Sequence, residues 1–145
     1  HYPQLTYETG LFMVAYLRRL HAEFDGDVAA AIVLGEIAQH NVRRLMKELL
    51  PQSGKDSAAL ATDEVVAASI RRCNMLSVAE ASGIPRETVR RKVAKLEKLG
   101  FVSRDAAGGL AVTRKVGRHF REFDRETLAG LVELAERVRG VLGRR

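Results

Sequence analysis

The spacing of hydrophobic residues predicts a mainly helical chain. Between Leu5 and Leu20, apolar residues fall at positions 5, 11, 12, 14, 16, 17 and 20, a spacing that favours a helix. A longer helix is expected over residues 28–50, with Asp27 as its capping residue. Its first half, residues 28–38, is apolar nearly all round. A helix of that kind is buried on more than one side, either beneath the rest of the fold or against a second subunit.

Three regions follow from the remaining pattern. Residues 51–57 have the composition of a linker, and a further helix is expected over residues 58–72. Residues 117–142 return to helical spacing, and Asp124 is expected to cap a second piece of that helix. We therefore expect an N-terminal helical region, a central module and a C-terminal helix, with bounds 1–52, 57–116 and 117–145. The terminal helices are expected to form a dimerisation layer, and the alternative is that they pack on each other within one chain.

Two helices joined by a tight turn are expected in the central module. Ser77 and Glu80 form a capping box that would begin the first helix. Gly83 suits the left-handed conformation at a helix C-terminus. Pro85 can begin the second helix, expected over residues 85–99, at a position where its missing N–H costs nothing. Two helices joined in this way are typical of a helix-turn-helix.

The second helix has one apolar and one charged side. An advance of about 100° per residue places Val89, Val93 and Leu96 on one stripe that is expected to be buried. The opposite side carries Glu87, Arg91, Ala94, Lys95 and Lys98. At the edges of that side lie Thr88 and Arg90. From Arg86 to Lys98 there are six basic residues and two acidic ones, a balance suited to an anion.

A β-hairpin is expected directly after this helix. Two short runs with β-branched residues, 101–104 and 110–114, surround the glycine-rich residues 105–109. A hairpin in this place is expected to act as a wing. Arg104 and Arg114 then stand where its stem could reach phosphates or a minor groove.

The segment from Ser77 to Val102 resembles the winged helix-turn-helix of bacterial transcription regulators of the MarR and GntR types. The resemblance is carried by the following residues: Ala79, Gly83, Ile84, Arg86-x-x-Val89-Arg90 and Leu96-Glu97-x-Leu99-Gly100-Phe101-Val102. It covers roughly residues 60–115 and departs at Pro85, where these families usually carry serine or a similar cap. It implies that helix 85–99 enters the major groove and that the wing, 101–114, contacts the backbone or the minor groove.

The positive charge is concentrated in the same part of the chain. The net charge is +6, and residues 61–122 hold thirteen Lys and Arg against seven Asp and Glu, so they account for the whole excess. A localised excess of this kind favours phosphate binding, because each neutralised phosphate releases counterions. We expect a homodimeric transcription regulator that binds double-stranded DNA in a sequence-specific way. The alternatives are a winged-helix module for protein–protein contact and, third, an enzyme.

Each candidate DNA-binding residue has an expected role. Arg91 and Lys95 project furthest from the buried stripe and are expected to reach base edges, with Glu87 and Thr88 adding a contact to cytosine or to a thymine methyl. We expect phosphate or minor-groove contacts from Arg86, Arg104 and Arg114. The candidate set is completed by Arg90 and Lys98 on the same charged surface.

Other chemistry finds little support in the sequence. A single cysteine, Cys73, excludes a disulfide framework and fits a reducing compartment, and a redox role for it is the less favoured reading. The four histidines are scattered, and no nucleophile–base pair or phosphate loop is present, so we expect no enzyme, no metal and no cofactor. No membrane span or signal peptide is expected, which favours a cytoplasmic protein. With 6% aromatic residues and no tryptophan, the sequence identifies no small-molecule effector.

Overall fold

The computed structural model describes residues 1–49 and 68–143, which form two compact units. One unit combines residues 1–28 with residues 117–145, and the other comprises residues 29–116. This division differs from the three expected regions, because the long second helix belongs with the central module rather than with the N-terminal helix. The expected linker, 51–57, lies outside the described residues.

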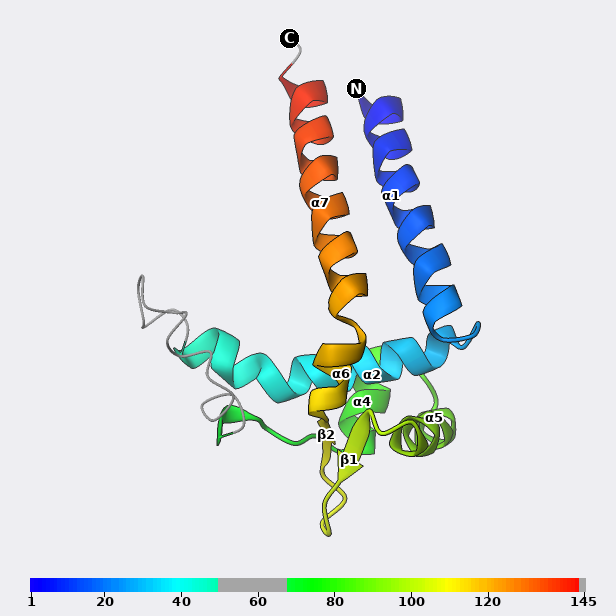
Figure 1. Cartoon of the computed structure of the whole chain (residues 1–145), viewed down its shortest axis with the longest axis vertical. Coiled ribbons are helices and arrows are strands. Elements are labelled where there is room, and N and C mark those ends of the chain that lie inside the picture. The colour runs from blue at the N-terminus through cyan, green and yellow to red at the C-terminus, as the bar shows by residue number, and fades with distance from the viewer. Residues whose placement is uncertain (50–67, 144–145) are drawn as a thin grey trace. The chain divides into compact units, whose positions relative to one another are not determined.

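The first unit is an antiparallel pair of long helices, α1 (Tyr2–Glu23) and α7 (Arg121–Leu142). Figure 1 shows them side by side, with both chain termini at the same end of the pair. Glu8 forms an ion pair with Arg137 at 3.2 Å, and Arg19 forms one with Glu126 at 2.6 Å. The two expected terminal helices are thus confirmed: α1 is longer than its apolar stretch indicated, whereas α7 begins four residues later than the expected start at residue 117.

The start of α7 differs from the sequence prediction. Asp124 is not a cap, because its backbone N–H already donates to the carbonyl of Phe120 at 2.8 Å within the first turn. The helix begins at Arg121, directly after Phe120. The ring of Phe120 stacks on that of Phe24 with centroids 5.4 Å apart, and this contact closes one end of the helix pair.

The second unit contains the remaining helices and the hairpin. Helix α2 (Val28–Arg44) continues into a π-helical turn, η1 (Leu45–Leu49), so the expected helix over residues 28–50 is confirmed through Leu49. Its residues Val33, Leu34 and Ile37 are buried within the single chain. Much of the apolar side of α2 is therefore covered without a second subunit, whereas Ile32 is 43% exposed, and a dimer contact through residues 28–38 stays a prediction.

Asn41 of α2 ties this helix to the hairpin. Its side chain is fully buried, and its amide nitrogen donates to the carbonyls of Arg71 at 2.8 Å and Leu110 at 3.1 Å. Its amide oxygen accepts from the backbone N–H of Val112 at 2.9 Å. A buried amide is tolerated only when its polar atoms are bonded, and here they are.

The hairpin consists of β1 (Val102–Arg104) and β2 (Leu110–Val112), which pair antiparallel with Ser103 opposite Ala111. The prediction of a mainly helical chain with a small β-hairpin is confirmed. In the turn, the Asp105 carboxylate accepts from the N–H groups of Ala107 at 3.0 Å and Gly109 at 2.7 Å.

A short extended segment pairs with the hairpin where a helix was expected. Cys73 bridges Leu110, with a backbone N–H donated in each direction at 3.1 Å and 2.7 Å. Arg71 donates its N–H to the carbonyl of Asn41 at 3.1 Å. The expected helix over 58–72 is therefore wrong over residues 70–72, where these bonds hold the backbone extended. Most of that expected helix, residues 58–67, lies outside the described residues.

Candidate nucleic-acid interface

Helix α4 (Met75–Ser82) begins earlier than the capping box predicted. Asn74 is the cap: its backbone is extended, and its side-chain oxygen accepts from the N–H of Ser77 at 2.8 Å. Ser77 is consequently the third residue of the helix, and the capping box with Glu80 is wrong. The Cys73 bridge to the hairpin explains the shift, because it leaves the next residue extended and able to cap.

The turn after α4 follows the prediction closely. Gly83 has φ +71°, and its N–H donates to the carbonyl of Ala79 at 3.0 Å. The N–H of Ile84 donates to the hydroxyl of Ser82 at 3.2 Å. Pro85, expected to begin the second helix, is instead the residue before α5 (Arg86–Lys98), which is one residue shorter at each end than the expected 85–99 and has no side-chain cap. The left-handed Gly83 thus ends α4, and Pro85, two residues later, precedes α5.

Helix α5 separates an apolar inner side from a charged outer side. Val89, Val93 and Leu96 are fully buried, as the helical spacing predicted. The charged residues on its other sides are exposed, and we call them the outer face of α5: Arg86, Glu87, Arg90, Arg91, Lys95 and Lys98. Thr88 is half-buried. The structure thus places five cations and one carboxylate together on the solvent side of a single helix.

Glu87 and Arg90 of the outer face form a bidentate ion pair. The Arg90 guanidinium donates to the two carboxylate oxygens at 2.6 and 2.9 Å. This hydrogen bonding lowers the pKa of Glu87 and raises the pKa of Arg90. Both groups therefore stay charged at neutral pH, and the guanidinium is held in a fixed orientation while one of its edges remains exposed.

Arg91 is held less firmly. One of its terminal nitrogens lies 3.4 Å from the Thr88 hydroxyl, at the long end of hydrogen-bond distances. A guanidinium in this position can turn toward a ligand without breaking a strong contact.

Arg104 of β1 is paired with a carboxylate of α5. Its guanidinium donates to both oxygens of Glu97 at 2.9 and 3.1 Å, and both side chains are about one-third exposed. This pair fastens the hairpin to the helix and partly neutralises the cation that was expected on a phosphate. Sequence reasoning placed Arg104 on the stem correctly but did not foresee its partner.

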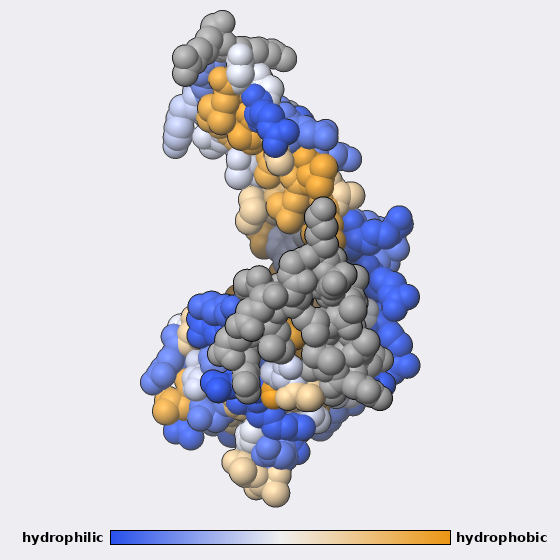
Figure 2. All heavy atoms as spheres, turned by 90° about the vertical axis from the view of Figure 1, so that its left-hand side faces the viewer, coloured by the Kyte–Doolittle hydropathy of each residue, from blue (hydrophilic) through white to orange (hydrophobic). Residues whose placement is uncertain are grey.

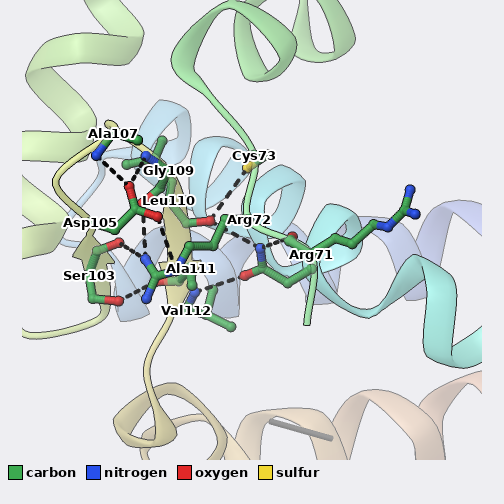
Figure 3. A network of polar contacts seen from close by, with 11 residues as sticks. Arg71, Arg72, Cys73, Ser103, Asp105, Ala107, Gly109, Leu110, Ala111 and Val112 are labelled. Atoms are coloured by element: carbon green, nitrogen blue, oxygen red, sulfur yellow. Dashed lines mark hydrogen bonds and ion pairs between the residues drawn. The ribbon is translucent and has the colours of Figure 1, made fainter. Parts of the chain in front are cut away.

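Arg72 forms a second link to the hairpin that the sequence did not predict. One of its terminal nitrogens donates to the carbonyl of Gly109 at 3.0 Å and lies 3.5 Å from that of Ser103, and its Nε lies 3.6 Å from the Asp105 carboxylate. Figure 3 shows the Arg72 side chain directed toward these groups, whereas Arg71 points away from them. The feature of the sequence that could have indicated this contact is Asp105, the one charged residue of the glycine-rich turn 105–109.

Arg114 lies outside the hairpin. It is the first residue of α6 (Arg114–His119) and is exposed, whereas sequence analysis placed it on the stem. Next to it, Lys115 donates to the carbonyl of Leu99 at 2.6 Å, and its ammonium lies 5.2 Å from the centre of the Phe101 ring. Lys115 thus supports the end of α5, a role that the sequence pattern did not indicate.

Metal and thiol chemistry find no site in the described part of the chain. No group of three or more His, Cys, Asp or Glu side chains there could hold a metal ion. Cys73 is buried, and this burial raises the pKa of its thiol, so little reactive thiolate is present at neutral pH. Among the described helices, none is both long and apolar enough to cross a membrane.

Comparisons of the chain with protein-family models, with curated proteins and with solved structures gave no match in any of the three. The resemblance to MarR- and GntR-type regulators therefore rests on the residues of this chain alone and stays a prediction.

Proposed function

We propose that the second unit is a winged helix-turn-helix that binds double-stranded DNA in a sequence-specific way, and that the protein regulates transcription in a bacterium. The observation that carries this proposal is the outer face of α5. Three exposed cations, Arg91, Lys95 and Lys98, lie with Glu87 on the side of the helix opposite a fully buried stripe, and the exposed Arg86 and Arg90 flank them. Helix α5 would lie in the major groove.

The dimensions and the charge of α5 suit that position. An α-helix with its side chains is about 10–12 Å across, and the major groove is about 12 Å wide. Cations along the helix shoulders would contact the phosphates on both sides of the groove, with release of counterions. Arg91, whose contact with the Thr88 hydroxyl is long at 3.4 Å, is the best candidate for a bidentate contact with guanine.

The hairpin is proposed to act as the wing. Arg104 ties it to Glu97 of α5, and Arg72 ties its turn to the segment that precedes α4. A fixed hairpin presents its backbone and stem to the neighbouring phosphates or minor groove without an added cost of ordering on binding. Its turn, residues 105–109, carries no cation, so the stem rather than the tip would meet phosphates.

Salt dependence of binding tests the electrostatic part of this proposal. Fluorescence anisotropy with a labelled random-sequence duplex, at 50–200 mM salt, should show affinity falling by several orders of magnitude. Lys98→Ala should lower the slope of log affinity against log salt by about one per site removed. Arg125→Ala, which removes an exposed cation from α7, is the matched control and should leave the slope unchanged. A flat response would contradict DNA binding and favour a protein-binding module.

A further inference from the structure

A small apolar residue lies among the charged residues of the outer face of α5. With about 100° per residue, four residues lie within about 60° of one another, on the side opposite the buried stripe: Glu87, Arg91, Ala94 and Lys98. Three of them are charged, long and exposed, whereas Ala94 is half-buried and ends at a single methyl group. That methyl can offer a ligand only an apolar contact.

One side chain that could cover Ala94 is drawn to the hairpin instead. A helical side chain leans toward the N-terminus and covers the turn before its own, so Glu97 and Lys98 are the residues placed to cover Ala94. Both carboxylate oxygens of Glu97 accept hydrogen bonds from the Arg104 guanidinium, at 3.1 and 2.9 Å. Because Arg104 belongs to β1, this pair holds the Glu97 side chain toward the hairpin.

The two arginines that precede Ala94 on this surface are directed toward the start of the helix. Arg90 donates two hydrogen bonds to the carboxylate of Glu87, three positions earlier. A terminal nitrogen of Arg91 lies 3.4 Å from the hydroxyl of Thr88, also three positions earlier. Both contacts lead away from Ala94. The charged surface therefore has a small apolar gap at Ala94.

An apolar gap of this size suits one base in the major groove. Thymine presents a C5 methyl group there, and alanine is among the residues that contact it. Ala94 follows Arg91 by three residues, which is about 4.5 Å along the helix axis, and stacked base pairs are about 3.4 Å apart. A thymine in contact with Ala94 would therefore lie one or two base pairs from the guanine proposed for Arg91.

We infer that Ala94 is a specificity-determining residue that contacts the C5 methyl of a thymine, one or two base pairs from the guanine bound by Arg91. This inference rests on the proposed function, because it requires α5 to lie in the major groove. It adds an apolar base contact to candidates that otherwise carry charges or a hydroxyl group. The DNA site should therefore combine a guanine and a thymine at a fixed separation.

The hairpin turn also exposes small apolar side chains, those of Ala106 and Ala107. Figure 2 shows this turn at the lower end of the view, where the surface is pale orange. A wing is expected on the DNA backbone or in the minor groove, and thymine presents its methyl group only in the major groove. A dependence of binding on that methyl group therefore reports a contact of α5 and not of the hairpin.

Replacement of single thymines by deoxyuridine tests this contact, because it removes the methyl group and keeps the base pairing. The duplex is the sequence that the full chain enriches from random duplexes, and the base pair at which Arg91→Ala relaxes the preference locates the guanine. For one thymine within two base pairs of it, anisotropy titrations should show affinity falling about fourfold, as expected for one buried methyl group. No such thymine, or no effect of its replacement, would overturn the contact and leave sequence-specific binding intact. No enriched sequence would contradict the proposed function itself.

Variants of Ala94 separate this contact from a general effect on the helix. Ala94→Gly should bind the thymine and deoxyuridine duplexes equally, so that the fourfold difference disappears. Ala81→Gly, at an exposed position of α4, controls for the cost of glycine in a helix and should keep the difference. Should circular dichroism show that Ala94→Gly is unfolded, Ala94→Val decides, because its added methyl groups should crowd the thymine methyl and turn the preference toward deoxyuridine. A fourfold preference for thymine that persists in the folded Ala94 variant would overturn the proposal.

Discussion

At the scale of single residues, two carboxylates limit how much positive charge the candidate interface offers. Glu87 binds Arg90, and Glu97 binds Arg104, each through two hydrogen bonds. Pairs of this kind at a surface contribute little to stability, because water screens them. Their larger effect is on orientation, since each holds a guanidinium in one direction before any ligand arrives.

Substitutions of Arg104 and of Glu97 should change the affinity for DNA in opposite directions. Glu97→Gln removes a negative charge next to Arg104 and should tighten binding to every duplex by about two- to fivefold. Arg104→Ala should weaken binding to all sequences about equally. It should also reduce the slope of log affinity against log salt by about one for each phosphate contact removed. Anisotropy titrations with selected and scrambled duplexes would measure both. Equal and unchanged affinities in the two variants would show that the hairpin stem does not touch DNA.

At the scale of elements, Asn41 is the residue on which the attachment of α2 to the hairpin depends. Asn41→Ala removes the partner of the Arg71 carbonyl and of the Val112 N–H, whereas the Leu110 carbonyl keeps the N–H of Cys73. Each orphaned group costs about 1–3 kcal/mol, so the free energy of unfolding should fall by about 2–4 kcal/mol. Urea unfolding of the full chain measures the change. Gln39→Ala, an exposed position on the same helix, is the control, and an equal loss in both variants would contradict this role.

The elements also show what the sequence could predict. The buried stripe of α5 and the glycine–proline turn before it follow local rules of helical spacing and backbone conformation, and they were predicted correctly. The cap at Asn74 and the extended Cys73 depend on a bridge to Leu110, 37 positions further on. Arg72 and Asn41 likewise gain their partners from distant segments. Such contacts leave no periodic signal in the chain, so the spacing of residues could not predict them.

At the scale of the whole molecule, the chain combines a charged unit with an apolar helix pair. We propose that the second unit binds DNA, and the homodimer expected from the sequence stays a prediction. A two-fold dimer of a DNA-binding unit implies a pseudo-palindromic site, with half-sites about one or more helical turns apart. The expectation that the helices at both ends of the chain form a dimerisation layer stays a prediction.

Selection of bound sequences from random duplexes, with the full chain, tests the central claim most directly. We predict an enriched pseudo-palindrome bound on the order of 10³-fold more tightly than a scrambled duplex. Arg91→Ala should lose about 1–3 kcal/mol on that site and relax the preference at one base pair, while its affinity for the scrambled duplex changes little. No enriched sequence, and equal binding of selected and scrambled duplexes by the unchanged chain, would contradict sequence-specific DNA recognition by α5.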